Sequence, residues 1–352
     1  MESNLSHPFV TIIMPIRNEA NCIARNLYAV TKQTYEIDCM EVLIADGISN
    51  DNTRAIIYDF ILAHPNLKIK VLDNPGKIVP TGINIALCKA QGEVIIRVDG
   101  HTTIEADYVR QCVETLQRTR ADNVGGRMNA LGNNPFGKAV ALATSTPFGI
   151  GGGRFHYSDK EEWVDTVYMG VWPRKVFEKV GLFDEELVRD QDDEFNYRLR
   201  AAGGKILLSP TIKSEYTVRS TPRALWRQYF QYGYWKVRVL QKHPRQMSLR
   251  QFVPPAFVLA LLGSVIIALF PVSRPLSPAL PLLYVLANLG ASLWTASHRG
   301  WSALPYLPII FAILHLSYGL GFLSGLFKFW NRWGDKTGKT PGFHPQSGVT
   351  LG

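Results

Sequence analysis

Three long stretches without Asp, Glu, Lys or Arg lie in the C-terminal part of the chain, at residues 252–272, 279–297 and 303–327. Each approaches the ~20 predominantly apolar residues that a helix needs to cross a bilayer. A single stretch of this kind could be a buried core helix, but three in succession with short connections favour insertion into a membrane. The sequence therefore predicts a globular part up to about residue 250, followed by membrane helices.

The averages over all 352 residues conceal this division, since 46% are hydrophobic and the mean hydropathy is −0.01. Residues 1–8 are polar and too short for a signal peptide, so we expect the globular part to stay in the cytoplasm. The cysteines are scattered and lack CxxC spacing, which argues against both a disulfide framework and a zinc site. They are Cys22, Cys39, Cys88 and Cys112.

The formal net charge of +9 predicts an anionic partner. Lipid headgroups and a phosphorylated substrate both fit this charge. Nucleic acid ranks last, because the sequence shows no signature of a nucleic-acid-binding module.

A run rich in β-branched residues at 93–98 predicts a buried strand, which ends in Asp99, Gly100 and His101. Open α/β sheets place ligand-binding groups at this end of a strand. In extended backbone, Asp99 and His101 would project from the same side, and Gly100 would let a ligand approach. The two side chains could share one divalent cation, and Mn²⁺ accepts both ligand types. The alternative is that Asp99-Gly100 simply makes a turn after a core strand.

Strands and helices alternate along the chain before this run. Predicted strands at 10–15, 41–47 and 68–72 are followed by predicted helices at 20–32, 54–64 and 79–90. This spacing implies βαβ units, a mostly parallel sheet and right-handed crossovers. The polar strand ends would meet at one edge of the sheet, where a nucleotide is expected to bind. They carry Arg17, Glu19, Asp46, Lys77 and Asp99.

Two common nucleotide-binding motifs are missing from the sequence. Neither GxGxxG after the first strand nor GxxxxGK[ST] occurs, which disfavours a dinucleotide-binding fold and a P-loop NTPase. Further along, residues 148–153 contain four glycines. Glycines at this density suit a mobile loop over a ligand, although a flexible surface connection explains them equally well.

Acidic residues cluster at the start of a helix predicted near residue 191. Such acids commonly cap a helix and complement its dipole. Mutual repulsion would also raise the pKa of the least solvated carboxyl group, which could then take a proton from a hydroxyl at neutral pH. The cluster consists of Asp190, Asp192, Asp193 and Glu194.

Residues 221–242 predict a helix with aromatic and aliphatic residues at helical spacing and cations interspersed. This composition is typical of a helix that lies in a membrane interface, with its cations near anionic headgroups. A helix packed on its own domain is the alternative.

The sequence resembles family 2 glycosyltransferases over about residues 9–245. The resemblance is carried by an ordered set: Pro15-Ile16-Arg17-Asn18-Glu19, Ala45-Asp46-Gly47, Asn84 and Val98-Asp99-Gly100-His101. Within that family the chain is most similar to the membrane-associated glucosyltransferases of succinoglycan-type exopolysaccharide synthesis. The resemblance implies an α/β fold, with a GT-A-like, mostly parallel nucleotide-sugar domain followed by C-terminal transmembrane helices. The implied divisions are 1–220 (catalytic), 221–250 (interfacial helix), 251–330 (about three transmembrane segments) and 331–352 (basic tail).

The resemblance also assigns donor-binding residues by position. Residues 15–19 would line the nucleotide, Asp46 would hydrogen-bond its base, and Lys77 would lie near the base or the diphosphate. A uridine nucleotide is the family default, so a UDP-hexose such as UDP-glucose is the expected donor. The nucleotide-sugar set is Pro15, Arg17, Glu19, Asp46, Lys77, Asn84 and Asp99.

The metal motif of the family is usually Asp-x-Asp, and Asp99 would begin it here. This chain has His101 at the third position, so Asp99 and His101 are the predicted metal ligands. Imidazole is an acceptable ligand but adds no negative charge, and the choice between Mn²⁺ and Mg²⁺ therefore stays open.

Two further family motifs imply a base and an acceptor site. A Glu-Asp pair near the start of a helix supplies the base, and here Gln191 and Asp192 take its two positions. Asp192 is therefore the predicted base, with Asp193 as the alternative register. Residues 231–235 resemble the Gln-x-x-Arg-Trp acceptor motif, with Tyr234 in place of Arg, so Gln231 and Trp235 would bind the acceptor.

The resemblance as a whole implies an inverting hexosyltransferase of exopolysaccharide or cell-surface glycan synthesis, acting on a lipid-linked saccharide. The implied partners are the nucleotide-sugar donor, the lipid-linked acceptor, membrane lipids and a polysaccharide-assembly complex, without nucleic acid. The implied location is a bacterial-type inner (plasma) membrane, with several crossings and a cytoplasmic catalytic domain.

Two other hypotheses remain. A catalytically inactive, glycosyltransferase-like membrane scaffold would account for His101 and Gln191. A nucleotidyltransferase would need a glycine-rich phosphate loop after the first strand, where this chain has residues 15–19 instead.

The apolar stretches also pose a topological problem. Three crossings would place the C-terminus opposite the cytoplasmic domain, whereas the cations after the last stretch favour the cytoplasm. One stretch could therefore be re-entrant or interfacial. The cations are Lys328, Arg332, Lys336 and Lys339.

Overall fold

A computed structural model describes residues 7–272, 274–335 and 340–343. The described residues form two compact units, one of residues 7–129, 157–216 and 340–343, the other of residues 130–156, 217–272 and 274–335. Residues 130–156 therefore group with the C-terminal helices, although the sequence placed them inside the catalytic domain. Lys336, Lys339 and most of the predicted tail at 331–352 lie outside the described residues.

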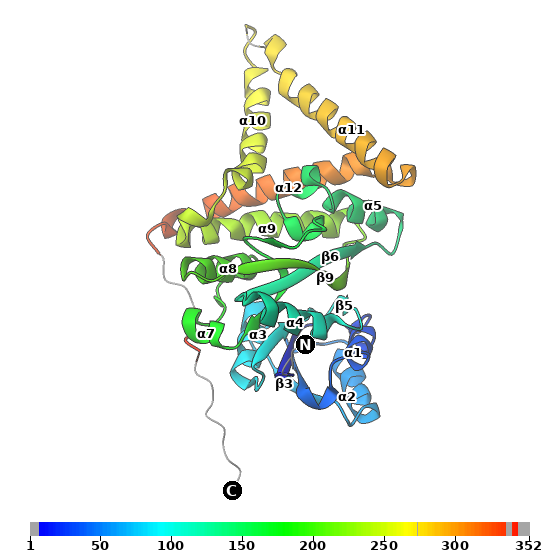
Figure 1. Ribbon diagram of the computed structural model, residues 1–352. Helices are drawn as coiled ribbons and strands as arrows, with labels where there is room; N and C mark the ends of the chain where they lie inside the picture. Colours follow the sequence, from blue (N-terminus) through cyan, green and yellow to red (C-terminus); the bar gives the residue numbers. More distant parts are fainter. Residues whose placement is uncertain (1–6, 273, 336–339, 344–352) are drawn as a thin grey trace. The chain divides into compact units, whose positions relative to one another are not determined.

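The first unit is built on a nine-stranded sheet with the order β3-β2-β1-β4-β8-β6-β9-β5, and β7 pairs with β9 (Figure 1). The strands are β1 (Val10–Ile16), β2 (Met40–Asp46), β3 (Lys68–Asp73), β4 (Val94–Arg97), β5 (Thr102–Ile104), β6 (Asn123–Leu131), β7 (Glu162–Trp163), β8 (Tyr168–Pro173) and β9 (Ile206–Thr217). Its helices are α1 (Ile23–Thr31), α2 (Thr53–Ala63), α3 (Val79–Lys89), α4 (Tyr108–Thr119), α7 (Lys175–Val180) and α8 (Gln191–Ala201).

The first four strands are parallel, as the alternation of strands and helices predicted. Every residue of β1, β2 and β4 is buried, which is why these strands read as continuous apolar runs. Helix α3 packs on β1 and β2, and α1 and α2 pack on each other on the other side of the strands (Figure 1). Because β2 and β4 flank β1, the strand order reverses between β1 and β4.

The remaining strands make the sheet mixed rather than mostly parallel. Strand β8 is antiparallel to both β4 and β6, and β5 and β7 are antiparallel to β9. Parallel neighbours need a long crossover connection. After β4, however, the chain turns at residues 98–101 and enters β5 directly. The predicted α/β class is confirmed, but the second half of the sheet is antiparallel.

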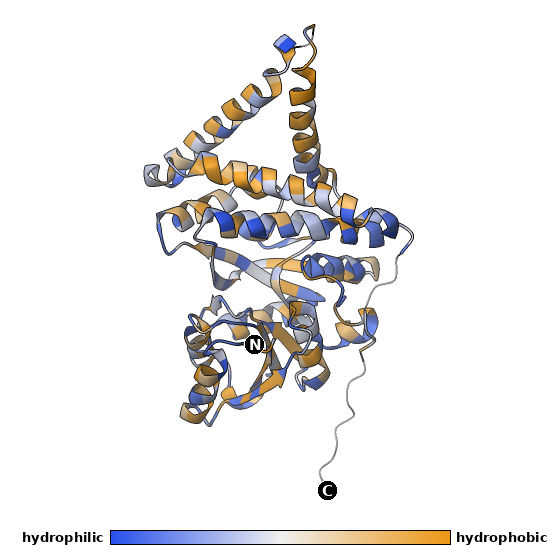
Figure 2. Ribbon diagram, turned by 180° about the vertical axis from the view of Figure 1, so that it is seen from behind, coloured by the Kyte–Doolittle hydropathy of each residue, from blue (hydrophilic) through white to orange (hydrophobic). Residues whose placement is uncertain are grey.

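The second unit is mainly helical in its described residues. It contains α5 (Pro135–Thr144), α6 (Pro147–Ile150), α9 (Pro222–Lys242), α10 (Val253–Ile267), α11 (Ala279–Arg299) and α12 (Leu307–Lys328). Three helical segments are long and apolar enough to cross a membrane: Leu249–Ile267, Arg274–Arg299 and Leu307–Lys328. The predicted hydrophobic helices are therefore confirmed, and Figure 2 shows their apolar residues in contrast to the mixed character of α9.

Candidate active site

The reversal of strand order places the ends of β1 and β4 side by side. In doubly wound sheets, such a switch point is where ligands bind beyond the carboxyl ends of the strands. Residues 17–19 leave β1 there, and residues 98–101 leave β4. Val98 donates its backbone N–H to the carbonyl of Ile13 (3.0 Å), which holds the two strand ends together.

Arg97, the last residue of β4, connects the two predicted reactive carboxylates. Its Nε donates to Asp99 Oδ1 at 2.7 Å and its Nη2 to Asp99 Oδ2 at 3.2 Å. Its Nη1 donates to Oδ1 of Asp192, 95 residues further along the chain. Because Arg97 is only 4% exposed and offers a planar fork of donors, it fixes both carboxylates with respect to β4.

The pKa values of the two carboxyl groups that contact Arg97 are shifted in opposite directions. Burial alone would raise the pKa of Asp99, but attraction by Arg97, assisted by His101 and Arg189, lowers it below its ordinary value. Burial raises the pKa of Asp192; Arg97 opposes this rise, while the negative charges of Asp99 and Asp193 add to it. Two carboxyl groups whose pKa values are pushed apart are suited to different roles.

Helix α8 distinguishes Asp192 from the other acids of its first turn. Glu194 is buried and paired with Arg198 at 2.7 Å, which gives it a structural role. The Asp192 side chain remains 40% exposed, so a hydroxyl group can reach it. Gln191 is buried, and its Oε1 has no hydrogen-bond partner among the described residues. The contact with Arg97 thus supports Asp192 rather than Asp193 as the candidate base, and this assignment stays a prediction.

His101 faces Glu19 across the switch point, with 3.4 Å between Nδ1 and Oε1. The expectation that Asp99 and His101 extend a strand is wrong, because β4 ends at Arg97 and the backbone N–H of Thr102 donates to the carbonyl of Asp99 (3.0 Å). These residues form a turn, which was the alternative interpretation.

Gly100 serves the packing of the turn rather than the approach of a ligand. A Cβ atom at Gly100 would lie 2.9 Å from both Glu19 Cγ and Ile16 Cγ2. Residues at the end of β1 therefore fill the space left by the missing side chain. The expectation that a ligand would use this space is wrong.

The donor set at this turn fits a divalent cation that is shared with a bound substrate. A metal-binding histidine usually points its second ring nitrogen at a carboxylate, as His101 Nδ1 does toward Glu19, and this leaves Nε2 for a ligand bond. Asp99 supplies an oxygen donor. Since no group of three His, Cys, Asp or Glu side chains converges among the described residues, the other ligands would have to come from the substrate, as is usual for Mg²⁺ at phosphates.

Asp46 and Lys77 lie at the ends of the neighbouring strands. Asp46 is fully buried and accepts hydrogen bonds from Ser49 Oγ (2.5 Å), Ser49 N (3.1 Å) and Arg54 Nε (2.5 Å). Its contact with a base stays a prediction, and its present partners shape the loop after β2. Lys77 is exposed and has a left-handed backbone (φ 60°), a strained conformation that clusters at functional sites.

The other residues predicted to bind the nucleotide-sugar make contacts within the protein. Pro15 is buried in β1, opposite Ala45 of β2. The exposed Arg17 lies with its aliphatic stem near Gly47, since a Cβ there would be 3.2 Å from Arg17 Cβ. Asn84 exchanges hydrogen bonds with the backbone of Phe183 (both 2.9 Å), which anchors the segment before α8 on α3. Nucleotide contacts by these residues stay predictions.

The predicted acceptor residues belong to the second unit. Trp235 on α9 packs against Phe329, with ring centroids 5.8 Å apart, so part of its surface is already used within the unit. Gln231 lies four residues earlier on α9 and is half-buried. In the glycine-rich stretch, residues 147–150 form α6, and the Phe148 carbonyl lies 2.7 Å from His315 Nε2. The first part of the predicted loop is therefore anchored on α12.

Arg97 is the site residue that the sequence prediction missed. Its signal was present, because a charged side chain within the run Val94–Val98 had to be buried and therefore needed charged partners. The identity of those partners depends on the tertiary structure.

Comparison with known proteins identifies a domain in this chain. The family model for "Glycosyl transferase family 2" matches residues 11–181, which include nearly all of β1, the strands β2 to β4, and Arg97 with Asp99. Asp192 lies beyond the matched residues. The chain carries a family 2 glycosyltransferase domain. The sequence-based prediction that the protein is a glycosyltransferase is thereby confirmed, and relatives similar over nearly the whole chain agree with it.

Two of these relatives match both the catalytic part and the C-terminal helices. The succinoglycan biosynthesis protein ExoA of Rhizobium meliloti is 29% identical over 91% of this chain and 96% of its own length. A transferase of Methanococcus voltae, the dolichyl N-acetyl-alpha-D-glucosaminyl phosphate 3-beta-D-2,3-diacetamido-2,3-dideoxy-beta-D-glucuronosyltransferase, is 28% identical over 91% of this chain and 98% of its own length.

A solved structure shares the fold of this glycosyltransferase. It is the mannosyltransferase PcManGT from Pyrobaculum calidifontis, in complex with GDP-Man and Mn²⁺. The TM-score is 0.59 at 18% sequence identity, over 91% of this chain and 88% of that one. At this identity, the likeness supports the fold alone.

Proposed function

We propose that this glycosyltransferase transfers a sugar from a nucleotide-sugar to a lipid-linked saccharide, with inversion at the anomeric carbon, in exopolysaccharide or cell-surface glycan synthesis. The observation that carries the proposal is the pairing of Arg97 with both Asp99 and Asp192 at the switch point of the sheet. This pairing joins two carboxylates to one buried guanidinium group. Asp99 is the candidate carboxylate on the diphosphate side, and Asp192 is the candidate base.

Asp192 takes the proton of the acceptor hydroxyl as that oxygen attacks the anomeric carbon. Its raised pKa suits a general base, and its exposed part admits the hydroxyl group. Arg97 orients Asp192 and keeps the deprotonated carboxylate in place. Because the attack comes from the face opposite to the leaving diphosphate, a single displacement inverts the anomeric configuration.

Asp99 and His101 would hold a divalent cation, Mn²⁺ or Mg²⁺, on the donor side of the site. When bound, such an ion supplies positive charge that stabilises the leaving diphosphate. Glu19 fixes the orientation of His101, and Arg97 fixes that of Asp99. The Mn²⁺ in the mannosyltransferase complex of the same fold supports a divalent ion as cofactor.

The nature of the acceptor is supported by the relatives and by the apolar helices. The name of the Methanococcus voltae transferase specifies a lipid-linked sugar phosphate, and that of the Rhizobium meliloti protein specifies succinoglycan biosynthesis. A catalytic domain joined to membrane helices can reach such an acceptor at the bilayer surface. We further propose a UDP-hexose donor, residues 1–220 as the cytoplasmic catalytic part, and a multi-pass inner-membrane location.

Release of nucleoside diphosphate by the detergent-purified protein tests the proposal. The assay uses a panel of nucleotide-sugars with Mn²⁺ or Mg²⁺ and a membrane lipid extract, beside the variants Asp192→Asn and Asp193→Asn. Release that requires the metal and is lost only in Asp192→Asn supports the transferase and its base. A folded protein that releases nothing from any donor would favour the inactive scaffold, and equal transfer to free saccharides would refute the lipid-linked acceptor.

The metal site has a test that does not depend on turnover. Nucleoside diphosphate together with Mn²⁺ should raise the melting temperature of the wild-type protein, since ligand binding stabilises the folded state. His101→Ala should reduce this rise, while Cys39→Ser, remote in sequence from the proposed ligands, should preserve it. An undiminished rise in His101→Ala would exclude His101 as a ligand.

A further inference from the structure

We infer that α12 does not cross the membrane but lies in the membrane interface beside α9, and that α10 and α11 alone cross, as a hairpin. This inference rests on the membrane association included in the proposed function. It concerns the surface that the second unit presents to lipid, and it gives the chain two crossings where composition alone suggests three.

Helices α9 and α12 run side by side with their backbones in close contact (Figure 1). A Cβ atom at Gly321 would overlap the carbonyl oxygen of Phe230, and one at Gly325 would lie 2.5 Å from that of Tyr234. From the α9 side, a Cβ at Gly233 would overlap the carbonyl oxygen of Tyr318. The residue numbers increase together along both helices, so α9 and α12 share one direction.

Helix α9 carries too many cations to span a bilayer. Each charged side chain at the centre of a membrane helix makes the insertion of that helix into the bilayer less favourable. Lys236 and Arg238 lie in the part of α9 that contacts α12, and the remaining cations are spread toward both ends of the helix. The full set is Arg223, Arg227, Lys236, Arg238 and Lys242. A helix packed parallel to α9 shares its orientation, so α12 also lies along the membrane surface.

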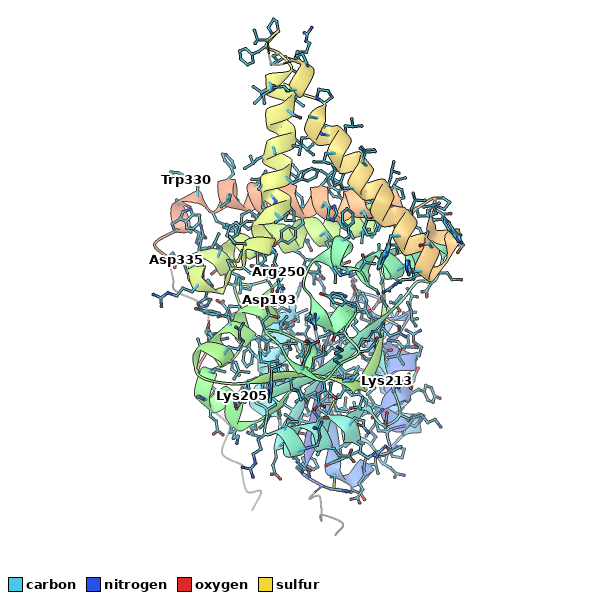
Figure 3. The ribbon with its side chains drawn as sticks, turned by 45° about the horizontal axis from the view of Figure 1, so that its top comes forward. Asp193, Lys205, Lys213, Arg250, Trp330 and Asp335 are labelled. Carbon is cyan, nitrogen blue, oxygen red and sulfur yellow. The ribbon has the colours of Figure 1, made fainter. Side chains whose placement is uncertain are left out.

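Both ends of α12 contact other helices of the second unit, α5 at its start and α9 at its end. At its start, Tyr306 stacks edge-on against Phe136 of α5, with 6.3 Å between ring centroids. Beyond its end, Asp335 lies 3.5 Å from Arg238 Nη2, and the carbonyl of Phe329 accepts a hydrogen bond from Gln241 (2.7 Å). Figure 3 labels Trp330 and Asp335 in this short segment after α12.

The outer face of α12 is suited to lipid. Half of the apolar stretch of α12 is buried within the protein, compared with 17% of the corresponding stretch of α10 and 11% of that of α11. Its more accessible apolar residues recur at helical spacing and form one stripe, which is expected for a helix that rests on protein and faces acyl chains. The stripe consists of Ile309, Leu316, Leu320, Leu323 and Phe327, with Ile309 58% and Phe327 83% exposed.

The distribution of cations agrees with two crossings. The connection between α10 and α11 carries Arg274 as its one Lys or Arg, whereas Arg299, Lys328 and Arg332 flank α12. With two crossings, the latter three lie on the same side of the membrane as the cations of α9. With three crossings, Lys328 and Arg332 would lie on the opposite side, against the preference of cations for the cytoplasm.

The test determines on which side of the membrane three points of the full-length chain lie. One protein carries an epitope tag at each terminus, and protease access to the tags is compared in spheroplasts and in inverted membrane vesicles. A second protein, Val272→Cys, is treated with a membrane-impermeant maleimide in both preparations. Val272 is 96% exposed and lies in the connection between α10 and α11, and the wild-type protein with its four cysteines provides the background.

The inference predicts that both tags are digested only in inverted vesicles and that the thiol introduced by Val272→Cys is labelled from the outside only. Digestion of the C-terminal tag in spheroplasts, with the N-terminal tag protected, would establish three crossings and overturn the inference. Labelling of the introduced thiol only in inverted vesicles would show that the α10–α11 hairpin does not cross, which also overturns it. The readout is independent of sugar transfer, so inactivity in the transferase assay would leave this result unaffected.

Discussion

At the ends of β1 and β4, a buried arginine holds two carboxylates by directed, charge-assisted hydrogen bonds, whereas α9 and α12 are held together by glycines that let their backbones touch. The first arrangement fixes the position of reactive groups while one of them, Asp192, stays partly open. The second fixes the orientation of an apolar helix. Substitutions in the first region should therefore change the reaction, and substitutions in the second should change stability.

The largest expected effect belongs to the candidate base. Asp192→Asn should lower kcat about 10²–10⁴-fold, because the amide cannot accept the proton of the attacking hydroxyl. Its thermal unfolding should stay close to that of the wild type, since Asn keeps a hydrogen-bond acceptor for Arg97. The measurement is initial-rate kinetics with the donor found in the panel. If Asp192→Asn lowered the melting temperature so far that unfolding explained the lost activity, the contrast between the two regions would be refuted.

The glycine contacts between α9 and α12 should give the largest effect on stability. Gly321→Leu forces a side chain against the carbonyl of Phe230 and should cost about 1–3 kcal/mol or more. Thermal unfolding in detergent measures the loss. The matched control is Gly263→Leu on α10, where nothing lies within 4 Å of the added Cβ. Equal melting temperatures for both variants would show that α9 and α12 do not pack as described.

Arg97→Lys should retain the charge but lose the fork that reaches both carboxylates. The three donors of an ammonium group sit on one nitrogen, so Lys cannot reproduce the hydrogen bonds that Nε, Nη1 and Nη2 of Arg97 make from three positions to Asp99 and Asp192. Loss of such a positioning partner typically costs about 10–100-fold in activity or metal affinity. The rate of sugar transfer and the rise in melting temperature caused by nucleoside diphosphate with Mn²⁺ should both be smaller in Arg97→Lys than in the wild type. Wild-type values in both assays would show that charge alone suffices at this position.

The smallest effect should appear in the pH dependence. A general base must be deprotonated, so kcat/KM rises with pH through the pKa of Asp192, which burial and the charges of Asp99 and Asp193 raise and Arg97 lowers. Asp193→Asn removes one negative neighbour and should move the acidic limb to lower pH, by less than about one unit. A limb that moves to higher pH would contradict the assigned environment of Asp192.

The parallel half of the sheet was predictable because its signals are local. The apolar runs of β1, β2 and β4, each followed by polar residues, identify buried strands and the edge where those polar residues meet. The antiparallel half carried weaker signals, since β5 and β7 have only three and two residues. Strands this short leave little periodicity to read.

The candidate site was predictable as a set of residues but not as an arrangement. The sequence contains Asp99, His101 and Asp192, and the family resemblance suggests their roles. That Asp99 begins a turn, that Gly100 makes room for Glu19, and that Arg97 joins two carboxylates follow from contacts between distant segments. The spacing of apolar residues along a strand or a helix does not specify such contacts.

The sequence by itself determined the three long apolar segments, the four parallel strands and the glycosyltransferase domain, because apolar length, hydrophobic periodicity and motifs can be read along the chain. The tertiary structure decided which carboxylates share Arg97 and which apolar helix rests on α9. A buried charge and a bare glycine backbone each require a complementary partner, and only folding brings that partner from elsewhere in the chain.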